Sequence, residues 1–207
     1  MKKATIILTI AIVIIAIAVI VVAVVMNQQK EKTKLGPINN IEDLTKIFEK
    51  VYEGQEDKIP SVETQPIDTT DDNMVNAMTG LISGKDLEYL AVSEAMMSSQ
   101  AYSFILAKVK DGVDANQIAK DMFNNVDTAK WICVYAEQVY ATSSGDVVCL
   151  VMSSKEWATP VYDSFKKVAG SVGEEYNRTE KEPVPDDFNG FDDNGFDEPI
   201  NALDGIE

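Results

Sequence analysis

The longest apolar run in the chain lies at its N-terminus. Ala4 to Met26 is a 23-residue run without charge, and Thr5 and Thr9 are its only polar side chains. As a helix this run would be about 35 Å long, which is enough to cross a hydrocarbon core of about 30 Å. A cleaved signal peptide has a shorter apolar region that ends in small residues. The pattern therefore predicts a retained transmembrane anchor at residues 1–26, with residues 4–26 in contact with the lipid bilayer.

The orientation of this anchor is not decided by charge, because lysines flank the run on both sides. A span that follows only three residues usually acts as a signal-anchor. We therefore expect a single-pass protein of the cell membrane with its following domain extracytoplasmic; the alternative is a domain that faces the cytoplasm.

Residues 27–37 are polar and end in Gly-Pro, which predicts a tether. The next apolar positions follow a helical spacing over Ile41–Tyr52, with Asn40 as the N-cap. A short edge strand is predicted near Ser61–Gln65. A second short helix is predicted to begin with Asp72 as its cap and to end near Gly84.

From Lys85 to Gly170 the pattern strand-strand-helix occurs twice. The predicted strand pairs are Leu87–Met97 with Ala101–Lys110, and Ile132–Thr142 with Val147–Met152. Asp114 is the predicted N-cap of the first following helix, and Thr159 and Pro160 are predicted to begin the last one. This order favours an α+β fold for residues 38–170, an antiparallel sheet with helices packed on one face.

The strand Val147–Met152 is apolar at both alternating sets of positions, so we expect both of its faces to be covered. The two C-terminal helices are one expected cover. The other is either the early helix Ile41–Tyr52 or a partner.

Residues 171–207 hold 2 basic and 12 acidic residues and show no amphipathic period. This composition predicts a disordered acidic tail. Its Asp, Asn and Gly residues do not match an EF-hand calcium loop in either possible register, since the first ligand and the bidentate glutamate are missing. We therefore predict no metal site there.

The whole chain has a formal net charge of −16 and contains no histidine. The charge disfavours nucleic acid as a partner. The absence of histidine removes the commonest general base and metal ligand. Adjacent carboxylates such as Asp71-Asp72 and Glu174-Glu175 are expected by chance in so acidic a chain. No catalytic, cofactor-binding or metal-binding residue is therefore assigned, and no cofactor is predicted.

The two cysteines, Cys133 and Cys149, could form a disulfide, a reactive pair or part of the core. A hairpin turn centred on Ser144-Gly145 would place Cys149 opposite Tyr140, about 23 Å along the strand from Cys133. That separation forbids a disulfide within the hairpin. We therefore expect both cysteines to be reduced and buried.

The combination of a short lysine-bearing start, one span, the segment "AKWICVYAEQVYATSSGDVVCLVMSS" and a helix ending "FKKVAG" resembles a family of membrane-anchored proteins from Firmicutes. The domain of that family has no assigned function. The resemblance covers roughly residues 72–170 and implies a Gram-positive envelope protein. It supplies no catalytic residues, and the acidic tail departs from its pattern.

Together these features predict a membrane-anchored envelope protein that binds a protein or cell-wall partner and is not an enzyme. The alternative is an enzyme, or an enzyme subunit, that acts on cell-wall material through carboxylates alone.

Overall fold

The computed structural model describes residues 33–181. The predicted anchor at residues 1–26 and the tail beyond residue 181 lie outside this part. Within residues 33–181, no helix has the length and apolarity that a membrane crossing requires.

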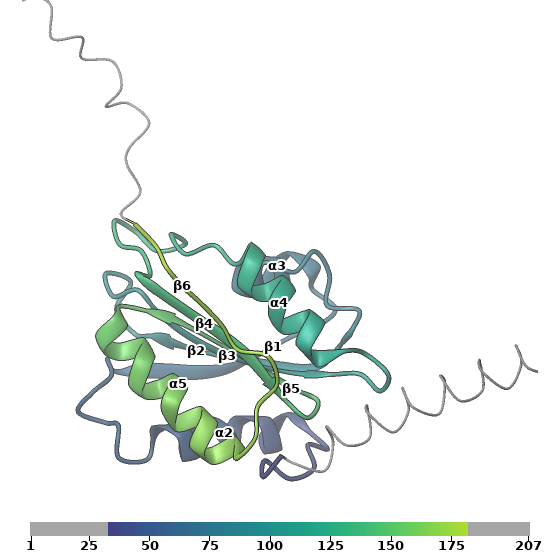
Figure 1. The fold of residues 1–207 in the computed structure, drawn as a ribbon. Coiled ribbons are helices and arrows are strands. Elements are labelled where there is room, and N and C mark those ends of the chain that lie inside the picture. Colours follow the sequence, from purple (N-terminus) through teal and green to yellow (C-terminus); the bar gives the residue numbers. More distant parts are fainter. Residues whose placement is uncertain (1–32, 182–207) are drawn as a thin grey trace, which may run out of the picture.

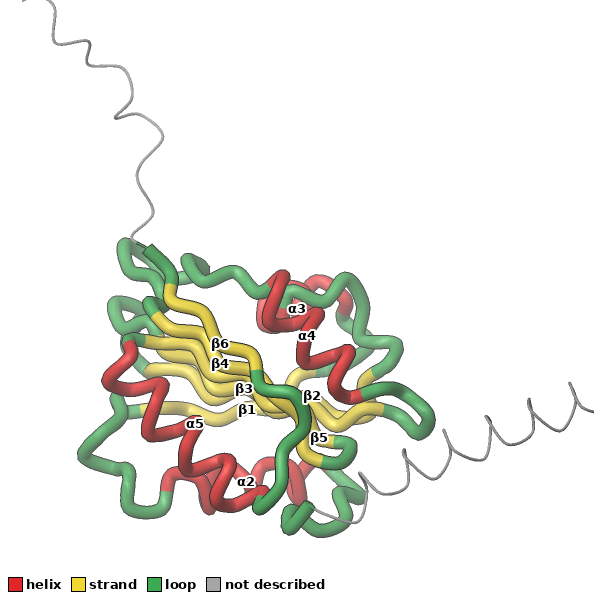
Figure 2. The backbone as a smooth tube through the Cα atoms, viewed as in Figure 1, coloured by secondary structure: helices red, strands yellow, loops and turns green. Residues whose placement is uncertain are grey.

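The described chain forms one six-stranded sheet and four helices, an α+β arrangement (Figures 1 and 2). The helices are α2 Ile41–Tyr52, α3 Asp72–Thr79, α4 Ala115–Asn125 and α5 Lys155–Ala169. The strands are β1 Val62–Ile67, β2 Leu87–Ala95, β3 Tyr102–Val109, β4 Gln138–Ser144, β5 Val147–Ser153 and β6 Tyr176–Thr179. The order in the sheet is β1-β2-β3-β5-β4-β6, and every neighbouring pair is antiparallel.

Local signals explain where the first helices begin. Asn40 caps α2, because its side chain accepts a hydrogen bond of 2.8 Å from the backbone N–H of Asp43. Asp114 caps α4 in the same way, through the N–H groups of Asn116 and Gln117. Both caps confirm the predictions from the sequence.

The two central strands, β3 and β5, are buried along their whole length. Alternate side chains of a strand point to opposite faces, so such strands need a cover on each face. On one face, Phe104 and Cys149 pack with side chains of α2 and α5. On the other, Ile105 and Leu150 pack with side chains of α3 and α4. The early helix α2 therefore covers one face of β5, but it shares that face with α5, whereas α3 and α4 cover the other.

The expected layer of helices on one face is wrong. Figure 1 shows α2 and α5 below the sheet and α3 and α4 above it, so the fold has three layers. The two C-terminal helices lie on opposite faces, because α4 connects β3 to β4 over one face and α5 connects β5 to β6 over the other. Helical spacing shows that a helix has an apolar side, but not which face of a sheet that side will cover.

Three helix boundaries, both ends of α3 and the start of α5, differ from the prediction. Asp71, not Asp72, caps α3, and the helix ends at Gly80 in the left-handed conformation (φ 74°) rather than near Gly84. The last helix begins at Lys155 with Ser154 as its N-cap residue, so Pro160 lies inside it rather than in its first turn. Gly170 ends this helix, as predicted.

The second hairpin is also shorter than predicted. Its first strand begins at Gln138, and residues 129–137 form a loop rather than strand. Gly145 takes a positive φ of 61° as the first of two turn residues, which shifts the pairing so that Cys149 lies opposite Thr142 and not Tyr140.

This change alters the interpretation of one cysteine. Cys149 is fully buried, and both cysteines are free, as expected. Cys133, however, is exposed in the 129–137 loop with a positive φ of 61°, so the prediction that it is buried is wrong.

The compact region also extends beyond both predicted boundaries. Residues 171–181, expected to belong to a disordered tail, include β6, which pairs with β4 and forms one edge of the sheet. Leu35, expected to lie in a free tether, is buried in the same core as α2 and α5. Both segments are short and mostly polar, so no hydrophobic periodicity marks them in the sequence. They are held in place by contacts with elements far away in the chain.

Candidate functional site

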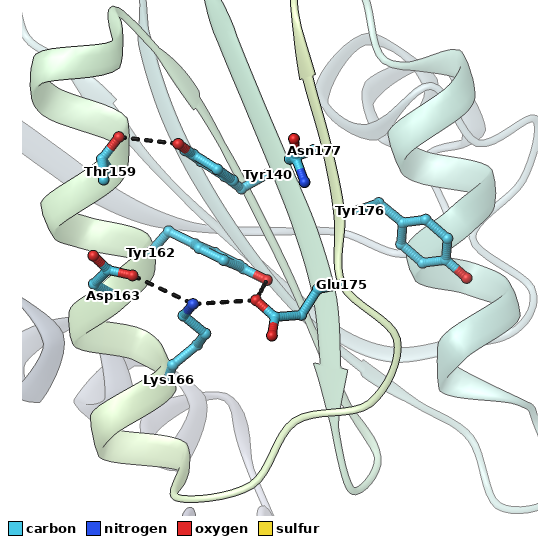
Figure 3. A pocket seen from close by; sticks show the side chains of 8 residues that line it. All are labelled: Tyr140, Thr159, Tyr162, Asp163, Lys166, Glu175, Tyr176 and Asn177. Carbon is cyan, nitrogen blue, oxygen red and sulfur yellow. Dashed lines mark hydrogen bonds and ion pairs between the residues drawn. The ribbon is translucent and has the colours of Figure 1, made fainter.

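A hollow of about 190 Å³ lies between α5 and β6, above β4 (Figure 3). We call it the α5–β6 hollow. Its lining residues are Tyr140, Thr159, Tyr162, Asp163, Lys166, Glu175, Tyr176 and Asn177.

The helix α5 supplies half of this lining through its regular spacing. Thr159, the pair Tyr162-Asp163 and Lys166 recur every three to four residues, so they project from one side of the helix. β4 contributes Tyr140 from the floor, and the chain that leads into β6 contributes Glu175 (Figure 3).

Two tyrosines form the floor and inner wall of the hollow. The rings of Tyr140 and Tyr162 are stacked, with centroids 4.7 Å apart and planes inclined by 9°. Tyr162 is buried, whereas Tyr140 is partly exposed to the hollow. The Tyr140 hydroxyl lies 3.0 Å from Oγ1 of Thr159, which fixes the orientation of this ring. The result is a rigid aromatic surface at the base of a shallow site.

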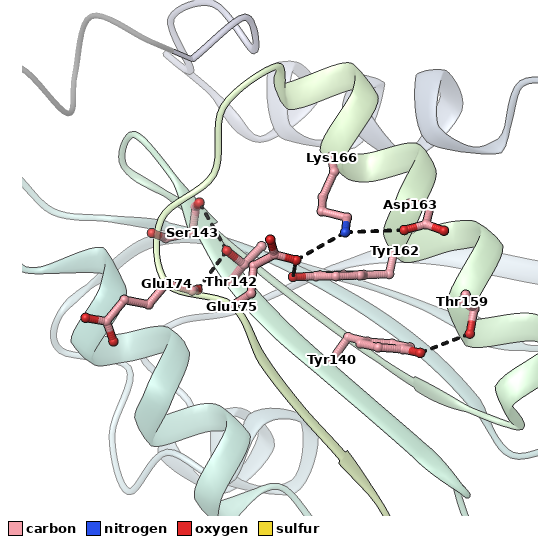
Figure 4. A network of polar contacts seen from close by, with 9 residues as sticks. All are labelled: Tyr140, Thr142, Ser143, Thr159, Tyr162, Asp163, Lys166, Glu174 and Glu175. Atoms are coloured by element: carbon pink, nitrogen blue, oxygen red, sulfur yellow. Dashed lines mark hydrogen bonds and ion pairs between the residues drawn. The ribbon is translucent and has the colours of Figure 1, made fainter.

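A charged network closes one side of the hollow (Figure 4). The Lys166 ammonium contacts Glu175 Oε2 at 3.1 Å and Asp163 Oδ1 at 3.3 Å. The Tyr162 hydroxyl donates a second hydrogen bond of 2.9 Å to the same Glu175 oxygen. Lys166 also lies 4.8 Å from the centre of the Tyr162 ring, in the geometry of a cation–π contact.

These contacts shift the protonation equilibria of all three groups. Partial burial opposes the charge on Glu175, but the hydrogen bonds from Tyr162 and Lys166 outweigh it and lower the pKa of the carboxyl group. Burial likewise disfavours the charge of Lys166, yet its contacts with Glu175 and Asp163 raise its pKa. Burial, followed by the bond to Glu175, raises the pKa of Tyr162 well above its ordinary value. At neutral pH Lys166 is therefore an ammonium, Glu175 a carboxylate and Tyr162 a neutral phenol.

The position of Glu175 depends on the α5–β6 connection, which is held to the end of β4 by several hydrogen bonds. Thr142 Oγ1 donates to the carbonyl of Glu174 at 2.9 Å, and the N–H of Gly173 donates to the carbonyl of Ser143 at 2.8 Å. Asn116 Oδ1 on α4 accepts from Ser143 Oγ at 2.7 Å and from the Glu174 N–H at 3.1 Å. A Cβ atom at Gly173 would lie 2.0 Å from that Asn116 oxygen, so a larger residue here would force the Asn116 side chain to move and would disturb these two hydrogen bonds.

Of the adjacent carboxylates noted in the sequence, only Glu175 reaches the hollow. Glu174 accepts a hydrogen bond from the Tyr176 hydroxyl instead. Asp71 caps α3, and Asp72 accepts a bond of 3.0 Å from the N–H of Gly84. None of the residues that line the hollow was predicted as a site residue from the sequence. The only sequence feature that could have indicated the hollow is the helical spacing of Thr159, Tyr162 and Lys166. The same spacing is found on any exposed helix surface, so it does not indicate a site.

A carboxylate pair does exist in the hollow. Because Asp163 and Glu175 both contact one ammonium, at 3.3 and 3.1 Å, the two contacting oxygens cannot lie further apart than the sum of these distances. That limit is compatible with the separation of about 5–5.5 Å found in retaining glycosidases. A general acid in such an enzyme needs a carboxyl group whose pKa is raised. The pKa of Glu175 is lowered instead, so this carboxyl group is not suited to donate a proton.

Among residues 33–181, no cluster of three or more Cys, Asp or Glu side chains is arranged to hold a metal ion. The thiol of Cys149 lies in the core, where burial raises its pKa and keeps it protonated.

Comparison with known proteins adds no relative: no family model, curated protein or solved structure matches the chain. The resemblance to Firmicute membrane-anchored proteins therefore stays a prediction, and the geometry of the hollow carries the functional interpretation.

Proposed function

We propose that this chain is a single-pass, membrane-anchored protein of a Gram-positive cell envelope, and that its extracytoplasmic domain binds a protein or cell-wall partner without catalysing a reaction. The observation that supports this proposal is the arrangement of the charged side chains in the α5–β6 hollow. Its charged groups are paired with one another, and the pKa values of Glu175 and Lys166 are shifted away from neutrality, whereas a catalytic site usually holds a group poised to gain or lose a proton near neutral pH.

The chemistry of the hollow also restricts what it binds. Two carboxylates against one ammonium leave a net charge of −1, so an anionic group is disfavoured. The ring of Tyr140 offers an apolar surface, and the amide of Asn177 offers both donors and an acceptor. This combination suits a neutral, hydrogen-bonding group such as a sugar hydroxyl, an acetamido group or a peptide amide.

The second candidate is the carboxylate-dependent, cell-wall-acting enzyme. The short separation of Asp163 and Glu175 favours it, and the lowered pKa of Glu175 opposes it. The hollow is also smaller than the roughly 300–1,000 Å³ typical of small-molecule sites. It therefore suits one group of a larger partner better than an enclosed substrate.

The test uses the full chain, purified in detergent, in co-sedimentation with isolated cell walls and in pulldown from envelope extracts. The Asn177→Ala variant removes an exposed side chain from the hollow, and Asn124→Ala removes an exposed asparagine on α4, on the opposite face. We expect Asn177→Ala to weaken one of the two interactions and Asn124→Ala to leave both unchanged. Equal binding by both variants would show that the hollow is not the binding site. Wall hydrolysis that disappears in Glu175→Gln would favour the enzyme instead.

A further inference from the structure

The N-terminal segment Thr33–Asn39 is fixed to the domain along most of its length. The Lys34 N–H donates to the carbonyl of Ala169 at 2.8 Å, at the end of α5. Ser144 Oγ, at the end of β4, donates to Thr33 Oγ1 at 2.8 Å. At the other end of the segment, the Tyr89 hydroxyl donates to the carbonyl of Asn39 at 2.9 Å. The segment is therefore held by three elements that are far apart in sequence.

Two glycines make room for this segment. A Cβ atom at Gly170 would lie 2.6 Å from Cδ of Lys34, and one at Gly145 would lie 3.1 Å from Cγ2 of Thr33. Both glycines also adopt positive φ values. Together with the buried side chains of Leu35 and Ile38, these close approaches show that residues 33–39 belong to the packed domain and not to a free tether.

All of these contacts lie at one end of the sheet, which we call the tether end. It includes the β4–β5 turn, the start of β2 and the β3–α4 loop, because the Val109 N–H donates to the carbonyl of Asp146 in that turn. The opposite, far end includes the β2–β3 turn and the 129–137 loop, where Lys130 contacts Glu94 at 2.6 Å. The nine residues of β2 run between the two ends, a length of about 30 Å.

Only residues 27–32 separate the apolar run that ends at Met26 from Thr33. Six residues span at most about 21 Å when fully extended. A chain this short cannot let the domain turn over and bring its far end to the membrane while residues 33–39 stay packed.

We propose that the tether end of the domain faces the lipid bilayer surface and that the far end, with Cys133, points away from it. This orientation rests on the anchor in the proposed function. It follows from chain length and from the packed N-terminal segment, so it requires no particular lipid headgroup. The far end also carries three exposed apolar side chains, Met96, Met97 and Ile132, and this orientation presents them away from the membrane.

The native cysteines allow a direct test on the full chain in vesicles. Cys133 is exposed at the far end and Cys149 is buried, so a thiol-reactive fluorophore labels Cys133 in the natural sequence. The matched variant, Cys133→Ser with Asp111→Cys, places the same label at an exposed position of the tether end. Energy transfer to an acceptor-labelled lipid then reports the distance of each end from the bilayer.

We expect energy transfer from position 111 to exceed that from position 133 by a factor of about two, because the two ends are about 30 Å apart. Inserting about twenty Gly and Ser residues between Lys32 and Thr33 lengthens the connection without altering the domain, and should remove most of this difference.

Flotation of the vesicles separates the possible failures. A chain that does not float with the vesicles overturns the proposed anchor and this orientation together. A chain that floats but shows equal transfer from both positions, or more from position 133, overturns the orientation alone. A difference that survives the insertion would show that chain length does not set the orientation.

Discussion

Tyr162 and Glu175 are joined by a hydrogen bond of 2.9 Å that connects the middle of α5 to the chain leading into β6. The donor ring is buried and stacked on Tyr140, while the acceptor carboxylate is exposed and also contacts Lys166. This bond holds the flexible side chain of Glu175 against the ring of Tyr162, which packing keeps in place. The shape of the α5–β6 hollow depends on it.

Removing this donor should cost stability without enlarging the core. We expect Tyr162→Phe to lower the free energy of unfolding by about 1.5–3 kcal/mol, the range for a hydrogen bond to a charged group, while its ring keeps the stack with Tyr140. Urea unfolding of the detergent-purified chain measures this change. Tyr176→Phe, which removes an exposed bond to Glu174, is the matched control and should cost less. Equal costs in the two variants would mean that the part-buried bond from Tyr162 to Glu175 stabilises the fold no more than the exposed bond from Tyr176 to Glu174.

The same network should give stability a defined pH dependence. The pKa of Glu175 is lower in the folded chain than its ordinary value of 4.5, so its ionised form stabilises the fold. This contribution is fully present above pH 4.5 and is lost as the pH falls through the lower, folded pKa. We therefore expect the stability difference between the natural chain and Glu175→Gln to be constant from pH 7 to about pH 5 and to shrink below that. Unfolding at several pH values measures it. A difference that grows on acidification would contradict the direction of the shift.

The two cysteines should behave as opposites. In the folded chain, a thiol reagent should modify Cys133 and spare Cys149, whose thiol is buried with a raised pKa. Cys149→Ser should lower the free energy of unfolding by about 1–3 kcal/mol, because it buries a hydroxyl group in an apolar layer. Cys149→Ala should cost less, and Cys133→Ser should be nearly neutral. Modification of both thiols in the folded chain would show that β5 is not covered on both faces.

Several features of the domain could be predicted from the sequence because their causes are local. The N-caps Asn40 and Asp114 bond to N–H groups two or three residues ahead, and Gly170 ends α5 through its own backbone conformation. The double cover of β5 was also readable, since every residue of Val147–Met152 is apolar and alternate residues must face opposite ways.

Tertiary structure decided the features that join distant segments. Gly145 could serve as the first or the second residue of a two-residue turn, and that choice moves Cys149 from Tyr140 to Thr142. The strand β6 is only four residues long and polar, so its order comes from pairing with β4, whose partner residues lie about forty positions earlier. The α5–β6 hollow combines Tyr140 from β4, Tyr162 from α5 and Glu175 from the connection to β6. Hydrophobic spacing specifies that a segment is helix or strand, but the choice among possible neighbours depends on packing energies summed over the whole core, which no short stretch of sequence contains.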